Sequence, residues 1–201
     1  MKIRRAVALF ITLSVVAALT LQFVLNGTKP GLEPWGPRLW DLLRYFTILT
    51  CGLVGVVMAG EAWGSPRGRN LHAMAAMNIA MVGVIYQILL APPEPMTGID
   101  WWPDFGFHVA IPIMTVLWWG VWAPKPLALA ALPIWLIWPT AYCGYALVRG
   151  GIEGKYPYFF FDIAKFGPAQ VAINVAGLVL VFAGAGLVVW VLARILPQQS
   201  T

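Results

Sequence analysis

Residues 169–195 read AQVAINVAGLVLVFAGAGLVVWVLARI, and charge enters this stretch only at Arg194. The hydrocarbon core of a bilayer is about 30 Å thick, and a helix of roughly 20 apolar residues spans it. This stretch is therefore long enough to cross a membrane as a helix. Working outward from it along the chain, five more apolar runs of similar length occur. The sequence predicts six transmembrane helices, at approximately residues 6–25, 39–63, 71–90, 105–122, 127–147 and 169–195.

The composition excludes most other classes of protein. Of the 201 residues, 60% are hydrophobic and only 10% are charged, with 11 Trp and 10 Phe. A soluble domain carries about 25% charged residues, and a disordered chain is poor in aromatic residues. Lys and Arg are spread along the chain and do not form the basic stripe that is typical of nucleic-acid binding. The sequence predicts an all-α, polytopic membrane protein with a single transmembrane domain over residues 1–201 and no nucleic-acid partner.

The distribution of Lys and Arg predicts an orientation in the membrane. These residues are denser in the short segments on one side, which holds the amino terminus, the loop near residues 65–70, the turn at residues 124–126 and the carboxyl tail. The positive-inside rule makes that side cytoplasmic. We expect a multi-pass protein of the plasma (inner) membrane, with the six helices in one bundle and both termini in the cytoplasm. The longer connections then face outward, where long ordered loops often shape a site.

Polar side chains inside the predicted spans gather at one depth. A helix rises about 1.5 Å per residue, so counting from each inner helix end gives a height for every side chain. Five helices place a polar side chain at a similar height in the outer third of the bilayer: Gln22, Thr47, Gln87, His108 and Tyr142. Arg149 and Asn174 lie higher, while His72 lies at the inner interface, where we expect it to be solvated. Because polar groups within a membrane usually face the bundle interior and mark function, we expect a cavity that opens outward.

Thr and His are the residue types left for catalysis. The two His and two Cys lack metal-ligand spacing, and the chain has no glycine-rich nucleotide motif and no G-x-S-x-G sequence, so we expect no metal and no cofactor. An imidazole within hydrogen-bond reach can take the proton of a Thr hydroxyl as that hydroxyl attacks an ester carbonyl. His108 is the only His well inside a span. Periodicity alone does not distinguish Thr47 from Thr50, Thr115 or Thr140.

Asp104 precedes His108 by one helical turn and has two interpretations. Its carboxylate can orient the imidazole, or it can be the N-cap of a helix that begins at Phe105. We favour the N-cap. Donors for the oxyanion of an acyl-transfer reaction could come from a group of polar side chains among which the sequence does not choose. These candidates are Gln87, Tyr142, Arg149 and Asn174.

Several of these residues also occur in an order that resembles a known family. The stretch Arg44-Tyr45-Phe46-Thr47, then His108, then the run from Arg149-Gly150 through Tyr156-Pro157-Tyr158 to Asp162, and finally Asn174, is similar to a widespread bacterial family of six-span membrane proteins. That family looks related to the eukaryotic androgen-induced proteins, including the androgen-dependent regulator of tissue factor pathway inhibitor. The resemblance covers most of the chain, from about Leu39 to Asn174.

The resemblance implies a reaction and two catalytic residues. In the eukaryotic relatives, a Thr and a His within the membrane hydrolyse fatty acid esters of hydroxy fatty acids. By this resemblance, Thr47 is the nucleophile, His108 is the general base, and the substrate is a lipid ester taken from the bilayer. The functional prediction is an intramembrane threonine hydrolase, a lipid esterase.

Two other functions fit parts of the sequence. A lipid-binding or transport protein without hydrolytic activity also carries ionisable residues and prolines within its spans, as at Pro112, Pro133 and Pro139. A structural subunit is the other alternative, since the small residues at 183–186 offer a helix-packing surface. A lipid-binding or transport protein predicts a cavity, whereas a structural subunit predicts none.

Overall fold

The computed structural model describes residues 2–65, 67–94 and 96–197, and this part of the chain is helical without a strand. The positions 1 and 198–201 of the expected domain lie outside the described residues. The α-helices are α1 (Lys2–Asn26), α2 (Trp35–Leu42), α3 (Phe46–Ala62), α4 (Arg69–Ile85), α5 (Trp101–Phe105), α6 (Ile111–Trp122), α7 (Leu132–Glu153) and α8 (Ile163–Ile195). Two π-helical segments extend them: Tyr86–Leu90 continues α4, and Gly106–Ala110 joins α5 to α6. Short 3-10 turns lie at Gly98–Asp100, Leu129–Ala131 and Phe159–Phe161.

Five continuous helical segments are long and apolar enough to cross a membrane. They are Lys2–Asn26, Arg69–Leu90, Gly98–Trp122, Leu129–Glu153 and Ile163–Ile195. Each contains most or all of one of the predicted spans, so the prediction of an α-helical, multi-pass membrane protein is confirmed.

The prediction of a continuous helix over residues 39–63 is wrong. α2 and α3 meet at 91° across the break at residues 43–45, so this stretch is one broken span or a re-entrant segment. A break exposes backbone carbonyls that must be satisfied within a membrane. Here α7 supplies the donors, because the Tyr145 hydroxyl donates to the Leu43 carbonyl at 3.0 Å and the Tyr142 hydroxyl donates to the Arg44 carbonyl at 2.9 Å. Apolar run length alone does not reveal these partners.

At two further boundaries the difference from the prediction has a local cause. α7 continues six residues beyond position 147 because Arg149 is paired rather than exposed to lipid: its Nε donates to Glu153 at 2.8 Å. α8 begins before Ala169, but its first turn is set off by Gly167, whose φ of 75° and ψ of 160° are not helical. Glycine adopts positive φ without the steric cost that a Cβ brings. The continuous part of α8 therefore starts close to the predicted residue 169.

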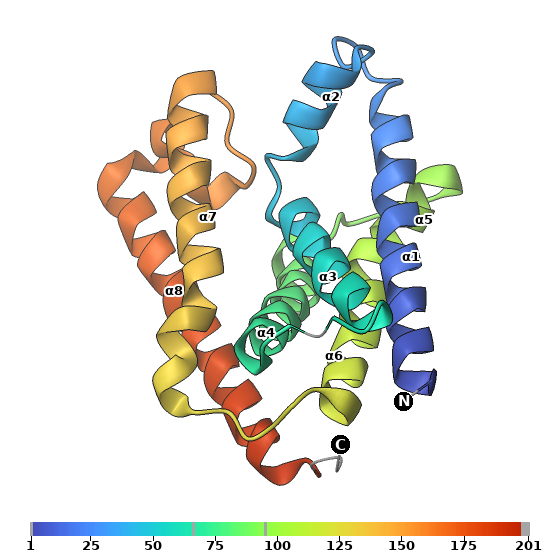
Figure 1. Ribbon diagram of the computed structural model, residues 1–201. Helices are drawn as coiled ribbons and strands as arrows, with labels where there is room; N and C mark the ends of the chain where they lie inside the picture. The colour runs from blue at the N-terminus through green and yellow to red at the C-terminus, as the bar shows by residue number, and fades with distance from the viewer. Residues whose placement is uncertain (1, 66, 95, 198–201) are drawn as a thin grey trace.

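The bundle is built around α4, which contacts α3, α6, α7 and α8. Figure 1 shows α7 and α8 side by side on one flank, α1 and α6 on the other, and α3 and α4 between them. α1 begins and α8 ends at the same end of the bundle, and the α2–α3 break lies toward the opposite end (Figure 1). Small buried residues of α4, such as Ala73 and Ala76, allow the neighbouring helices to approach closely.

His72 is buried, and the prediction that it is solvated is wrong. Its ring is 1% exposed, with Nε2 2.8 Å from Oε1 of Glu61 and Nδ1 3.1 Å from the Gly68 carbonyl. Glu61 also pairs with Arg4, and the His72 ring stacks on Trp118. Four helices meet at this buried cluster, and the ion pair is what makes burial of the His72 ring and the Glu61 carboxylate possible.

Candidate functional site

A polar cavity of about 360 Å³ lies at the end of the bundle that holds the α2–α3 break. Its walls come from the last turns of α1, the start of α3, the π segment after α4 and the π segment before α6. Thr47 and His108 both line it, as do Gln22, Asn26 and Asp104. The structure thus brings Gln22, Thr47 and His108, which come from separate spans, to one cavity.

His108 is held in one orientation by a carboxylate. Its Nδ1 lies 3.0 Å from Oδ1 of Asp104 and also 3.0 Å from the Asp104 carbonyl oxygen. A Nδ1–H donor leaves Nε2 as the ring atom with a free lone pair. Within the described residues, Nε2 of His108 has no hydrogen-bond partner, and the ring lines the polar cavity. This is the tautomer and orientation that a general base needs.

Asp104 is not an N-cap, so that interpretation is wrong. The helix begins earlier than predicted, at Gly98, which places Asp104 inside it. The Asp104 carboxylate instead accepts hydrogen bonds from His108 and from the Tyr86 hydroxyl, the latter at 2.7 Å. The Tyr86 ring also stacks on the imidazole, with the ring centroids 3.5 Å apart. Tyr86 and His108 both belong to π-helical segments, which occur frequently at functional sites.

Thr47 is the second residue of α3, directly after the break. It forms no direct hydrogen bond with His108 in the described part of the chain, although both residues line the polar cavity. The backbone amides at the start of a helix carry partial positive charge. Those of α3 are not capped by the side chain of its N-cap residue Tyr45. A hydroxyl at this position therefore lies beside groups that can stabilise negative charge.

A network of charged side chains holds the break that positions Thr47. Arg149 of α7 donates to the Trp40 carbonyl at 2.6 Å and to the Tyr145 hydroxyl at 2.7 Å, in addition to Glu153. Arg44 pairs with the other oxygen of Glu153 at 2.6 Å. These bonds tie α2 and the break to α7. They also occupy the Arg149 guanidinium, one of the candidate oxyanion donors.

The other three candidate donors are also placed away from Thr47 or committed to partners. The Tyr142 hydroxyl donates to the Arg44 carbonyl. Asn174 donates to the Phe160 carbonyl at 2.9 Å and accepts from Gln170 at 3.0 Å. Gln87 lines a different space together with His108, a groove on the membrane-facing surface between α4 and α6. The structure thus brings Thr47, His108 and Asp104 to one cavity and leaves these four outside it.

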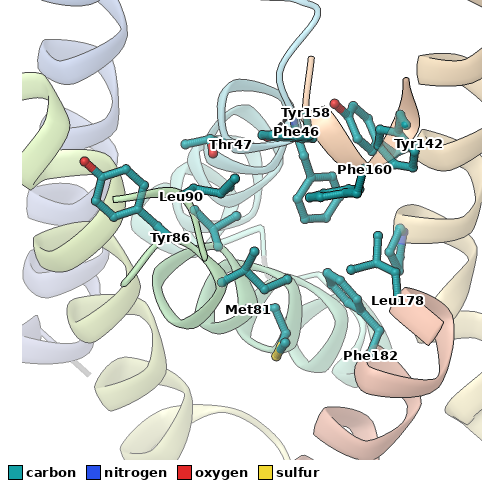
Figure 2. A pocket seen from close by; sticks show the side chains of 14 residues that line it. Phe46, Thr47, Met81, Tyr86, Leu90, Tyr142, Tyr158, Phe160, Leu178 and Phe182 are labelled. Atoms are coloured by element: carbon teal, nitrogen blue, oxygen red, sulfur yellow. Dashed lines mark hydrogen bonds between the residues drawn. The ribbon is translucent and has the colours of Figure 1, made fainter. Parts of the chain in front are cut away.

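A narrow apolar cavity adjoins the polar one on the far side of Thr47. It has room for about 30 Å³ and is lined by aromatic and aliphatic side chains of α3, α4, α7 and α8. Figure 2 shows Thr47 at its edge, between Tyr86 on one side and Phe46 and Tyr158 on the other. Thr47 therefore lies on the wall between a polar space and an apolar one.

Tyr86 and Tyr158 lie at the site although they were not predicted as site residues. The Tyr158 hydroxyl accepts a hydrogen bond from the Phe46 amide at 3.2 Å, so it lies at the start of α3. Burial raises the pKa of the Tyr158 phenol, although the hydrogen bond from the Phe46 amide acts in the opposite direction. The stretch Tyr156-Pro157-Tyr158 was a signal for the second residue, but nothing in the sequence distinguishes Tyr86 from its neighbours.

Comparison of the chain with protein-family models, curated proteins and solved structures finds no match. Within the described residues, no group of three or more His, Cys, Asp or Glu side chains is placed to hold a metal ion. The arrangement of the site itself is thus the basis for a functional assignment.

Proposed function

We propose that this protein is a membrane-embedded hydrolase of lipid esters, with Thr47 as nucleophile and His108 as general base. One observation carries the proposal: a cavity shared by a Thr at a helix start and a His whose Nδ1 is bound by a carboxylate. A nucleophile, a base and a group that orients the base are the parts that covalent acyl transfer requires. The resemblance to the androgen-induced proteins suggests esters of hydroxy fatty acids as the substrate class.

The first half of the reaction acylates the enzyme. His108 Nε2 takes the proton of the Thr47 hydroxyl while Oγ1 attacks the carbonyl carbon of the ester. The tetrahedral intermediate then collapses, the bond between the carbonyl carbon and the alcohol oxygen breaks, and His108 returns its proton to the departing alkoxide. Asp104 accepts the Nδ1–H bond throughout and stabilises the imidazolium form.

The second half of the reaction hydrolyses the acyl-enzyme. His108 Nε2 removes a proton from a water molecule, which attacks the carbonyl carbon of the Thr47 ester. Collapse of this intermediate breaks the bond to Oγ1, and His108 gives the proton back to Thr47. The products are a fatty acid and the regenerated hydroxyl, so atoms and charge balance over the cycle.

The oxyanion of both intermediates needs donors close to Thr47. The Phe46 amide donates to the Tyr158 hydroxyl, so the donors at this helix start are the first-turn amides that follow Phe46 and the Tyr158 hydroxyl itself. Backbone amides at a helix start stabilise developing negative charge without reorganisation. We assign the oxyanion site to this position and not to Tyr142, Arg149 and Asn174, which have other partners, or to Gln87, which lines the groove between α4 and α6.

The proposal includes an orientation in the membrane. Lys2, Arg4 and Arg5 begin α1 at one end, and the polar cavity lies at the other. With the positively charged end in the cytoplasm, the cavity faces the extracytoplasmic leaflet of the plasma membrane. A lipid ester could then reach the site from that leaflet.

Labelling with a fluorophosphonate probe tests the proposal. The purified protein is expected to be labelled at Thr47, and Thr47→Ala is expected to abolish labelling while Thr47→Ser retains it. Thr140→Ala removes an exposed hydroxyl on α7 and is the matched control. Labelling that persists in Thr47→Ala would remove Thr47 as the nucleophile. A wild-type protein that binds lipid without turning over any ester would instead favour a lipid-binding or transport protein.

A further inference from the structure

The membrane-facing surface carries a groove between α4 and the helix formed by the second π segment and α6. The groove is open to the outside of the bundle, has a volume of about 730 Å³, and is apolar along its length except for Gln87 and His108. A helix rises about 1.5 Å per residue, so from His108 to Leu117 the groove runs about 14 Å toward the other end of the bundle. Its length lies within the membrane-spanning segments.

The shape of the groove follows from the sizes of its side chains. A Cβ added at Gly83 would lie 3.1 Å from the His108 carbonyl oxygen and 3.4 Å from Cβ of Pro112, so a glycine there lets the two helices approach closely. Larger residues line the same groove and are exposed to lipid: Val84 is 48% exposed and Leu117 is 62% exposed. The close approach at Gly83 thus forms the floor of the groove, and the larger side chains form its edges.

His108 belongs to the lining of both the groove and the polar cavity, whereas Thr47 lines the polar cavity and not the groove. Because of this separation, the acyl half and the alcohol half of an ester would bind at different positions in the site. The acyl half stays bonded to Thr47 after the first step. The alcohol half must begin within hydrogen-bond reach of His108, because His108 protonates its oxygen as the bond to the carbonyl carbon breaks.

We infer that the groove between α4 and α6 binds the hydrocarbon chain of the alcohol half of the ester. The inference rests on the proposed function, since it uses the roles of Thr47 and His108 to orient the substrate. On the acyl side, the apolar cavity beside Thr47 is much narrower, with about 30 Å³. The site therefore gains more from a long alcohol chain than from a long acyl chain, and the freed alcohol returns to the bilayer along the groove.

Two series of simple esters test the alcohol half and the acyl half of the substrate separately. One series keeps the acetyl group and lengthens the alcohol, from ethyl through octyl to hexadecyl acetate. The other keeps ethanol and lengthens the acyl group to ethyl palmitate. With purified protein, kcat/KM is expected to rise more steeply along the first series than along the second, because only the alcohol chain has an apolar groove to enter.

Filling the groove is expected to reverse the preference for a long alcohol. Val116→Trp on α6 and Ala80→Phe on α4 place bulk in the groove from opposite sides. Each should lower kcat/KM for hexadecyl acetate by at least about tenfold, the effect of excluding about two methylenes from an apolar site. Ethyl acetate should change by less than about twofold by the same reasoning. Val188→Trp, at a lipid-exposed position of α8, is the matched control and should leave both substrates unchanged.

The outcomes separate this inference from the proposed function. Equal losses for ethyl and hexadecyl acetate in a groove variant whose Thr47 still reacts with the phosphonate would overturn the groove assignment and leave the hydrolase intact. A hexadecanol carrying a photoreactive diazirine gives a readout without turnover. A further outcome is that the wild type hydrolyses no ester while this probe crosslinks to α6 in the wild type and not in Val116→Trp. That result would support the groove as the binding site of the alcohol chain and would contradict the hydrolase activity. Equal crosslinking in both proteins overturns the groove.

Discussion

The Tyr86 ring stacks on the His108 imidazole, with the ring planes 3° from parallel, and its hydroxyl donates to the same Asp104 oxygen that His108 contacts. One side chain from the end of α4 thus touches both members of the His–Asp pair, which lie on the next span. Stacking fixes the plane of the imidazole, and the hydrogen bond fixes the carboxylate. We therefore treat Tyr86 as a positioning residue.

Tyr86→Phe and Tyr86→Leu distinguish the effect of stacking on His108 from the effect of the hydrogen bond to Asp104. Phe keeps the stacking and loses the hydrogen bond to a carboxylate, which is worth about 1.5–3 kcal/mol. We expect Tyr86→Phe to lower kcat by about tenfold with little change in KM, because the bond affects the His108 pair and not substrate binding. Tyr86→Leu loses both contacts and should lower kcat further. Equal kcat values for Tyr86→Phe and the wild type would show that the hydroxyl does not position Asp104.

Asp104→Asn tests whether the carboxylate orients the base. Asn can accept the Nδ1–H bond, but it can also turn its amide group to donate, which favours the wrong tautomer, and it does not stabilise the imidazolium. The rate of phosphonate labelling is expected to fall by about 10²–10⁴-fold, the usual contribution of a general base. Asp100→Asn removes another acid, which lines an adjoining space together with Asp104 and His108 and has no bond to His108 in the described residues. A similar loss in both variants would indicate a general charge effect.

The sequence predicted the helical spans because a helix must be apolar over about 20 residues to cross a bilayer. This criterion located five spans. It failed at residues 39–63, because the break there depends on the hydroxyls of Tyr142 and Tyr145, which lie about 100 residues further along the chain. No local pattern signals such a contact. The same limit explains His72, whose burial depends on Glu61 and Arg4.

The candidate site was predictable in part, for a similar reason. Counting helical rise placed Thr47 and His108 at one height, and the structure puts both on one cavity. Height, however, does not give the direction of a side chain around its helix. Arg149 and Asn174 were therefore grouped with the site although their bonds lie elsewhere, and Tyr86 was missed although it is adjacent to Gln87.

Tyr142→Phe is expected to destabilise the protein. Removal of the hydroxyl leaves the Arg44 carbonyl at the helix break without its donor, which costs about 1–3 kcal/mol for a buried group. Unfolding in a mild detergent, followed by intrinsic fluorescence, measures the loss. Tyr156→Phe is the matched control, since the Tyr156 hydroxyl has no hydrogen bond within the described residues. If the two variants are equally stable, the Tyr142 hydroxyl does not support the break.

The cluster at the opposite end of the bundle should affect stability without affecting the site. Glu61→Gln removes the charge that pairs with both Arg4 and His72, and we expect a loss of about 1–3 kcal/mol because Arg4 is partly solvated. The rate of phosphonate labelling at Thr47 should stay within about twofold of the wild type, since no contact links the cluster to the cavity. Glu33→Gln, at an exposed position, should change neither quantity. A large loss of labelling in Glu61→Gln with full stability would contradict a purely structural role.

Tyr158 makes stability depend on pH in the alkaline range. Burial raises the pKa of its phenol above the value of about 10 that it has in an unfolded chain. The folded state therefore binds a proton that the unfolded state releases above about pH 10, so this contribution is complete below that pH and is lost as the pH rises toward the folded pKa. Tyr158→Phe cannot ionise, so between about pH 9 and 11 its melting temperature should fall less steeply than that of the wild type. Parallel melting curves for the two proteins across this range would show that the Tyr158 hydroxyl has the same pKa in both states and is not held as a neutral donor beside Thr47.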